Sequence, residues 1–230
     1  MTDYAQYCPV ALASSVIAER WTPLIIRELV LGARRFNEID RGLPGISRSL
    51  LKQRLGHLER KGVVVRVELK HGRGHEYQLT PAGRDLEGVI MAVGEWAVRW
   101  MFSEPEPRDV DPVTLTWWMS RRVVKDAVPE QRTVVEFDYT GEDPTRIWMV
   151  MERGDTSVCT DPPGFDVDVV VTTQPVELMR IFSGIIGYRE ALLGGTIAVA
   201  GPTRLTTALP HWFAWSPFAP AVSKQLAARA

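Results

Sequence analysis

Hydrophobic residues recur at helical spacing between residues 47 and 62. Leu51, Leu55 and Leu58 are separated by steps of four and three, which places them on one face of a helix. Ser47 is suited to cap the start of that helix. Polar residues and a glycine fall on the opposite face: Ser49, Lys52, Gln53, Gly56 and Arg60. The pattern predicts an amphipathic helix with its leucines against a core and its polar face outward.

Three further helices are predicted before this one. Residues 9–21 have helical spacing and begin with a proline, which the first turn of a helix tolerates. Residues 22–32 follow, with Thr22 as the expected cap and a glycine as the expected left-handed end. Residues 36–46 read as a short helix closed by a Gly-Leu-Pro-Gly loop. The basic helix is therefore expected to be the fourth.

Two strands are predicted after the basic helix. Residues 63–70 and 75–80 are rich in β-branched residues or alternate, and the His-Gly-Arg-Gly segment between them is typical of a hairpin tip. This order of helices and hairpin is that of a winged helix-turn-helix domain. In such a domain the apolar face of the fourth helix is anchored, which leaves its N-terminal polar face free for the major groove of DNA. Arg73 at the tip is placed to reach phosphates or the minor groove.

The charge of the chain is unevenly distributed. The net charge is −1, yet residues 34–75 contain eleven Lys or Arg against four Asp or Glu, an excess of seven positive charges. Residues 76–230 contain fourteen against twenty-one, an excess of seven negative charges. Such asymmetry suggests a polyanion-binding segment, although charge alone fits a solvated surface equally well. The helix and hairpin pattern favours the polyanion.

Several motifs carry a family resemblance: Cys8-Pro9, Trp21, RRFNEI (34–39), LPGIS (43–47), LKQRL (51–55), LERKG (58–62) and LTPAG (79–83). In this order, over residues 5–102, they resemble the HxlR family of bacterial winged-helix regulators. The resemblance implies a homodimeric repressor or activator that binds double-stranded DNA. By resemblance, the recognition helix is assigned Ser47, Arg48, Ser49, Lys52, Gln53 and Arg54, and the wing is assigned Lys70, His71 and Arg73. We expect Arg48 and Gln53 to read base edges, and Lys52, Arg54 and Arg73 to neutralise phosphates.

The helix predicted after the hairpin has features of a dimer interface. Thr80 is suited to cap it and Pro81 to begin it. Apolar residues then recur at four- and three-residue steps: Leu86, Ile90, Val93, Ala97 and Trp100. This heptad-like row can pair with a second copy of the chain or pack within its own chain. A homodimer is favoured because two DNA half-sites need two recognition helices.

The second half of the chain has a different pattern. Residues 103–112, with three prolines and four acidic residues, are predicted to form an extended linker. Beyond it a helix (113–124) precedes four strand-like segments, two helical segments, a further strand and a final helix. This order predicts an antiparallel sheet covered by helices. The whole chain is therefore expected to be α+β, with a DNA-binding and dimerisation domain (1–102), a linker (103–112) and a second domain (113–230).

The second domain resembles the sterol carrier protein type 2 family over residues 113–213. The resemblance rests on VVEFDYTGE (134–142), DVDVVVTTQPVELMRIFSG (166–184) and LGGTIAVAGPTRLTTAL (193–209). It implies an apolar tunnel for a lipid-like ligand, and hence an apolar small-molecule effector. Such a cavity has ten candidate lining residues: Trp117, Trp118, Trp148, Met149, Met151, Ile181, Phe182, Ile185, Ile186 and Trp212. Plain core packing is the alternative for each of them.

The sequence offers little other chemistry. No nucleophile motif, phosphate loop or metal-ligand cluster occurs, so no enzyme activity, cofactor or metal is expected. His71 and His75 are four apart, but in a hairpin rather than a helix. Cys8 occupies a position where some HxlR-like regulators sense oxidants, and an inert thiol is the alternative. Two cysteines, no membrane-length apolar run and an N-terminus without signal-peptide features predict a cytoplasmic protein without disulfides.

These patterns together predict a homodimeric transcription regulator with a ligand-sensing second domain. The alternative is a carrier of lipids or small molecules whose basic domain serves another partner.

Overall fold

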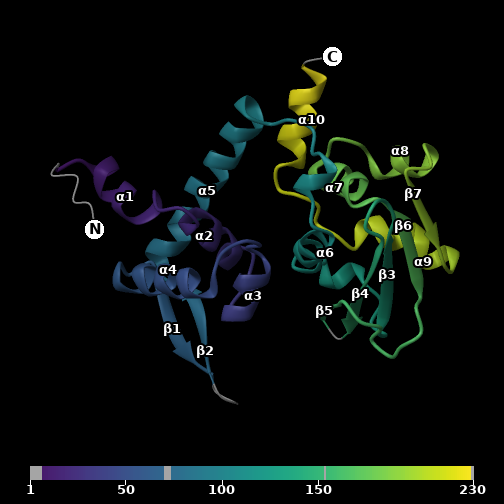
Figure 1. The fold of residues 1–230 in the computed structure, drawn as a ribbon, viewed down its shortest axis with the longest axis horizontal. Helices are drawn as coiled ribbons and strands as arrows, with labels where there is room; N and C mark the ends of the chain where they lie inside the picture. The colour runs from purple at the N-terminus through teal and green to yellow at the C-terminus, as the bar shows by residue number, and fades with distance from the viewer. Residues whose placement is uncertain (1–6, 70–73, 153, 229–230) are drawn as a thin grey trace. The chain divides into compact units, whose positions relative to one another are not determined.

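The chain folds into two compact units, Met1–Gly94 and Glu95–Ala230 (Figure 1). The computed structural model describes residues 7–69, 74–152 and 154–228. Each unit has its own hydrophobic core. Within the described ranges, no helix combines the length and apolar character needed to cross a membrane.

The N-terminal unit contains the predicted order of helices and hairpin. Its elements are α1 (Pro9–Ile17), α2 (Thr22–Val30), α3 (Phe36–Arg41), α4 (Arg48–Arg60), β1 (Val64–Glu68), β2 (His75–Leu79) and most of α5 (Pro81–Trp100). Strands β1 and β2 are antiparallel, with Val64 opposite Leu79 and Glu68 opposite His75. The helix, short helix, basic helix and hairpin predicted from the pattern are thus confirmed, with ends shifted by a few residues.

Helix α4 is anchored by its leucine face. Leu51, Leu55 and Leu58 are all completely buried, as predicted, and join a core built from α2, α3, α4 and the hairpin. Burying a leucine side chain stabilises the folded state by about 1.5–3 kcal/mol. These three leucines therefore hold the helix firmly against the rest of the unit.

The helix ends follow the predicted capping at two of three positions. The hydroxyl of Ser47 accepts the Leu50 N–H at 3.3 Å and caps α4. The hydroxyl of Thr80 accepts the Gly83 N–H and donates to the Gly62 carbonyl, which caps α5 against the foot of the hairpin. The prediction for Thr22 is wrong, because Trp21 adopts a left-handed conformation (φ 78°) and α2 begins one residue earlier.

The C-terminal unit is a mixed sheet with helices. Its elements are η1 (Pro107–Asp109), α6 (Pro112–Ser120), η2 (Lys125–Ala127), β3 (Thr133–Tyr139), β4 (Thr145–Glu152), β5 (Asp155–Cys159), β6 (Val169–Thr173), α7 (Pro175–Ser183), α8 (Tyr188–Leu193), β7 (Ile197–Ala200), α9 (Thr203–Ala208), η3 (Leu209–His211) and α10 (Ala219–Ala227). The predicted α+β composition is confirmed, whereas α10 was not predicted.

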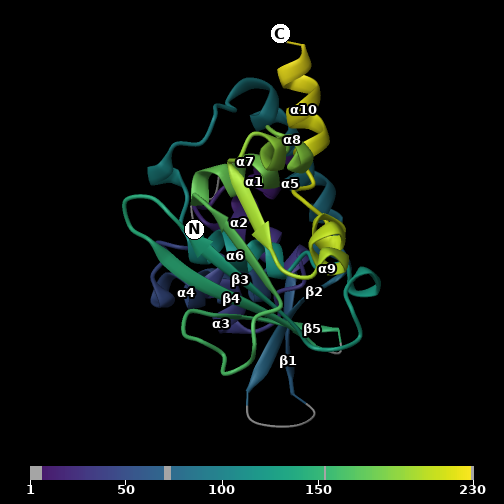
Figure 2. The ribbon, with the colours of Figure 1, turned by 90° about the vertical axis from the view of Figure 1, so that its right-hand side faces the viewer.

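The strand order of this sheet is β5-β4-β3-β6-β7 (Figure 1), and Figure 2 labels β3, β4 and β5 in a second view. The expectation of a fully antiparallel sheet is wrong, because β3 and β6 are parallel while the other neighbouring pairs are antiparallel. Strands β3, β4 and β5 form a meander, and residues 160–168 then return the chain to the free side of β3. A connection of this length allows β6 to run in the same direction as β5, which neither strand's own pattern reveals.

The two faces of the sheet carry different clusters. Helical side chains from α6, α7, α8 and α9 pack on one face together with Phe137, Met149 and Met151. The other face carries a small cluster of Val134, Trp148 and Val150. Neighbouring residues of a strand point to opposite faces, so Trp148 is separated by the sheet from the main core.

Candidate nucleic-acid interface

The first two turns of α4 present a polar surface. Ser47, Arg48, Ser49, Lys52 and Gln53 are all exposed, and we call these five residues the α4 polar face. The hydroxyls of Ser47 and Ser49 are 3.1 Å apart. The side chains of Lys52 and Gln53 make no hydrogen bond or ion pair with the described part of the chain. Their donors are therefore available to an external ligand such as the edge of a base or a phosphate.

Arg48 differs from its neighbours because its guanidinium is already bound. It forms an ion pair with the Asp40 carboxylate at 2.6 Å and donates to the Asn37 side-chain carbonyl at 2.8 Å. It also lies over the Phe36 ring, 4.8 Å from the ring centroid. All three partners belong to α3. In this structure Arg48 therefore joins α3 to α4 rather than projecting freely.

Arg54 departs from its predicted placement. It was assigned to the recognition surface, but its side chain is only 17% exposed and its Nη1 atom is 2.5 Å from Glu19 Oε2. Glu19 lies between α1 and α2. Because Arg54 falls between the leucine face and the α4 polar face, it turns toward the body of the unit. Its expected phosphate contact is thus replaced by an internal ion pair.

The wing is described only at its base. Three of the predicted DNA contacts lie outside the described residues: Lys70, His71 and Arg73. Below the tip, Arg66 Nε on β1 is 3.9 Å from Glu59 Oε1 at the end of α4. On β2, His75 Nε2 and the Tyr77 hydroxyl are 3.0 Å apart. Burial raises the pKa of Tyr77, and the nearby Arg66 cation offsets part of that effect. The ion pair between Arg66 and Glu59 thus links the base of the wing to the end of α4.

The partners of the two bound arginines were not found by sequence reasoning. Asp40 and Asn37 precede Arg48 by eight and eleven residues, across the turn between α3 and α4. Glu19 precedes Arg54 by thirty-five residues. No helical spacing links such positions, because the contacts depend on the angle between helices. The spacing of residues within α4 alone could not reveal these partners, because they lie outside that helix.

The apolar row of α5 also differs from the predicted one. Leu86 and Ile90 pack against the core of the N-terminal unit, and Ala97 is half-buried. The exposed apolar side chains, which we call the α5 stripe, are Val89, Val93, Trp96 and Trp100. Val93 and Trp100 belong to both sets. The predicted row combined a core-facing side at the start of the helix with an outward side further along, which spacing alone does not separate.

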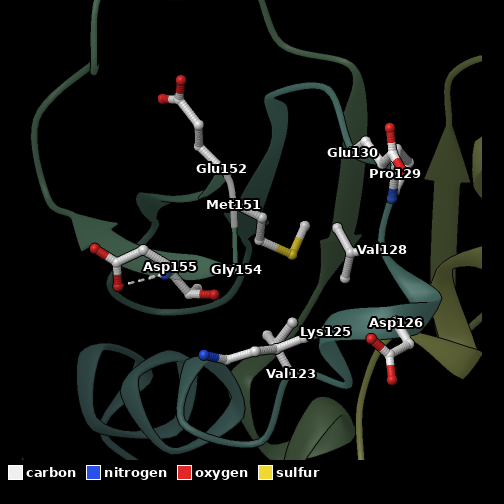
Figure 3. Close-up of a pocket in the computed structure, with 11 residues that line it drawn as sticks. Val123, Lys125, Asp126, Val128, Pro129, Glu130, Met151, Glu152, Gly154 and Asp155 are labelled. Carbon is white, nitrogen blue, oxygen red and sulfur yellow. Dashed lines mark hydrogen bonds between the residues drawn. The ribbon is translucent and has the colours of Figure 1, made fainter.

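A cavity of about 450 Å³ lies in the C-terminal unit, between the η2 turn and the β4–β5 hairpin. Its apolar lining includes Val123, Val128 and Met151, and Figure 3 shows Met151 and Val128 pointing toward one another. Its polar lining includes a lysine and four acidic residues: Lys125, Asp126, Glu130, Glu152 and Asp155. This cavity is therefore more polar than the apolar tunnel that was expected.

The ten predicted pocket residues are mostly core residues. Met151 lines this cavity, and the other nine do not. Met149, Ile181, Phe182 and Trp212 are buried in the main core, with Trp118 and Ile186 packed against it. Trp117 is also buried and Ile185 is half-buried. Trp148 lies on the opposite face of the sheet, where its indole N–H donates to Glu136 at 2.9 Å. Among the described residues, no group of three His, Cys, Asp or Glu side chains is placed to hold a metal ion.

A helix with a buried leucine face and an exposed polar face, set against α3 and followed by an antiparallel hairpin, defines a winged helix-turn-helix unit. The profile of the HxlR-like helix-turn-helix family matches residues 16–105. The HTH-type transcriptional regulator YvaP of Bacillus subtilis (strain 168) is 34% identical over 101 residues, which are 43% of this chain and 94% of YvaP. The chain therefore belongs to the HxlR-like helix-turn-helix family and is a transcriptional regulator of that kind.

Two further similarities each cover less than half of the chain. The HTH-type transcriptional regulator Mb3122 of Mycobacterium bovis is 43% identical over 88 residues, which are 38% of this chain and 55% of that protein. The solved reduced form of the transcriptional regulator YodB from B. subtilis has 34% sequence identity and a TM-score of 0.38, and the match covers 42% of this chain and 96% of that one. The resemblance of the C-terminal unit to sterol carrier proteins stays a prediction.

Proposed function

We propose that this regulator binds operator DNA as a homodimer, with the α4 polar face in the major groove. The observation that carries the proposal is the contrast between the two sides of α4. Leu51, Leu55 and Leu58 are fully buried, while Ser49, Lys52 and Gln53 are exposed at the N-terminal end of the same helix. In helix-turn-helix proteins the N-terminal residues of the recognition helix contact base edges.

The exposed side chains are proposed to have two roles: some contact base edges, and others contact phosphates and position the protein on the DNA. Gln53 carries an amide that can bind adenine through two hydrogen bonds, and Ser49 can donate to or accept from a base edge. Lys52 is a compact cation suited to a phosphate, as predicted from the sequence. The three wing residues Lys70, His71 and Arg73 are proposed as further backbone contacts. Arg54 is removed from this set because Glu19 holds it.

The α5 stripe supports the homodimer. Val89, Val93, Trp96 and Trp100 follow one another at steps of four, three and four, the spacing of a coiled-coil seam. Two large indole rings in such a row, 54% and 66% exposed, are costly to leave in water. Pairing of two stripes would cover them and would also supply the second recognition helix that a two-part operator requires.

The C-terminal unit is proposed to sense a small molecule. Support for this comes from the helices that pack on one face of its sheet, an arrangement expected from the predicted sterol-carrier resemblance. Val123, Val128 and Met151 offer an apolar surface inside the cavity for part of such a ligand. Ligand occupancy can alter DNA binding only if the ligand binds the DNA-competent and DNA-incompetent states with different affinities.

Selection of bound duplexes from a random pool tests the DNA proposal. A regulator of this kind should enrich a sequence with two related half-sites about one helical turn apart. Enrichment of no sequence would contradict it. Mass spectrometry of small molecules that co-purify with the protein, followed by operator titration with each one, tests the sensor proposal. Superimposable titration curves with and without every such molecule would contradict sensing.

A further inference from the structure

We propose that Asp40 is a specificity-determining residue, which holds the guanidinium of Arg48 against α3 and so limits binding to DNA of unrelated sequence. The proposal rests on the DNA-binding function proposed for the α4 polar face. It concerns a residue of α3 that no motif of the sequence singled out, and it assigns Arg48 a role other than the base contact expected from its position.

The geometry of the contact supports a defined, oriented interaction. The shortest Arg48–Asp40 distance, 2.6 Å, lies at the short end of the range for charge-assisted hydrogen bonds. The Asn37 carbonyl accepts a second bond at 2.8 Å, and the Phe36 ring lies under the guanidinium. One side of α3 carries all three partners, which are the first, second and fifth residues of that helix: Phe36, Asn37 and Asp40. The guanidinium is therefore held by a carboxylate, an amide and an aromatic face at once.

The electrostatic setting explains why a carboxylate is suited to this position. Arg48 is the first residue of α4, where the helix dipole is positive and a cation is disfavoured. Asp40 is 22% exposed and offsets that repulsion, while Arg48 remains 63% exposed. Arg48, at the N-terminus of the proposed recognition helix, is thus close to the surface proposed to face DNA. Its positive charge is nevertheless neutralised within the protein by Asp40.

The balance has a consequence for DNA binding. Affinity for unrelated DNA comes almost entirely from cations that neutralise phosphates and release counterions. To contribute to that affinity, Arg48 would have to leave Asp40, Asn37 and Phe36 together. Lys52 has no such internal partner in the described residues and contributes fully. Asp40 therefore lowers the sequence-independent part of the affinity for DNA. The base contacts proposed for Ser49 and Gln53 are kept, because the contacts of Arg48 fix the position of α4 against α3.

Asp40→Asn is the decisive variant, because it removes the charge while preserving size and a hydrogen-bond acceptor. Release of Arg48 adds one phosphate contact per bound chain. The slope of log affinity against log salt concentration should then steepen by about 0.9 per chain, and affinity for an unrelated duplex at 0.15 M salt should rise about fivefold for each bound chain. The ratio of operator to unrelated-duplex affinity should fall.

Two controls separate this mechanism from a general change of charge. Asp85→Asn removes the same charge from an exposed position on α5 and should leave both affinities unchanged. In an Arg48→Gln background, Asp40→Asn should also have no effect, because there is no guanidinium to release. A double-mutant cycle over Asp40 and Arg48 measures this dependence directly.

The experiment is a fluorescence anisotropy titration of operator and unrelated duplexes at several salt concentrations, using the full chain and its variants. The proposal is supported if Asp40→Asn strengthens unrelated-duplex binding only when Arg48 is present. It is overturned if Asp40→Asn binds as the parent does, or if the gain persists in the Arg48→Gln background, which would reflect repulsion between Asp40 and DNA. Failure of the parent protein to bind any duplex would instead contradict the proposed function.

Discussion

Leu55→Ala tests the anchoring of the recognition helix. Leu55 is completely buried and lies between Leu51 and Leu58 in the core of the N-terminal unit. Its truncation removes buried carbon atoms and leaves a cavity, which costs about 2–5 kcal/mol in well-packed cores. Domains of this size have a free energy of unfolding of about 5–15 kcal/mol, so the loss is a large share of the total. Each kcal/mol lowers the melting temperature of a domain of about 100 residues by roughly 4–8 °C.

The assay is thermal unfolding followed by far-UV circular dichroism, with DNA binding measured well below the transition. Lys52→Ala, on the exposed side of the same helix, is the matched control and should change stability by less than about 0.5 kcal/mol. We expect Leu55→Ala to melt at least about 8 °C lower and Lys52→Ala to melt with the parent. Equal melting of the parent and Leu55→Ala would refute the buried leucine face.

Three further predictions concern other parts of the chain. Gly42→Ala should destabilise the protein by about 1–3 kcal/mol in urea unfolding, because the added Cβ would lie 2.0 Å from the Oε2 atom of the buried Glu28; an unchanged midpoint would contradict this packing. Val93→Asp should convert dimer to monomer in analytical ultracentrifugation, and a persistent dimer would exclude the α5 stripe as the interface. Burial raises the pKa of Tyr188 from 10.0 to about 12, so the neutral phenol stabilises the fold below pH 10 and this contribution declines as pH rises toward 12. Tyr188→Phe should therefore lose less stability at alkaline pH than the parent in thermal melts measured across pH, and identical pH profiles of the two proteins would contradict this.

The sequence predicted the elements of the N-terminal unit because each carries a local signal. Leu51, Leu55 and Leu58 identify the buried side of α4 by spacing alone, and Ser47 marks its start. The hairpin follows from β-branched residues around a glycine-containing turn. The start of α2 was misplaced because a left-handed tryptophan is rare and has no sequence signature.

The site was predicted less completely because the positions of its side chains depend on partners that are distant in the sequence. Arg48 and Arg54 were both placed on a helix by spacing, but Asp40 and Glu19 decide where their guanidinium groups point. The parallel pairing of β3 and β6 likewise depends on a long connection rather than on either strand. Trp148 was grouped with Met149 although neighbouring strand residues face opposite sides of a sheet.

The most direct test of the account compares the parent protein with the Lys52→Ala/Gln53→Ala variant on the selected operator, across a range of salt concentrations. The account predicts that the parent binds with an affinity that falls steeply with salt. The variant should lose about fivefold at 0.15 M salt for the phosphate contact of each bound chain. It should lose a further 1–3 kcal/mol, roughly, for the base contact, while melting as the parent does. Equal operator affinity of the folded variant and the parent would contradict the claim that the α4 polar face binds DNA.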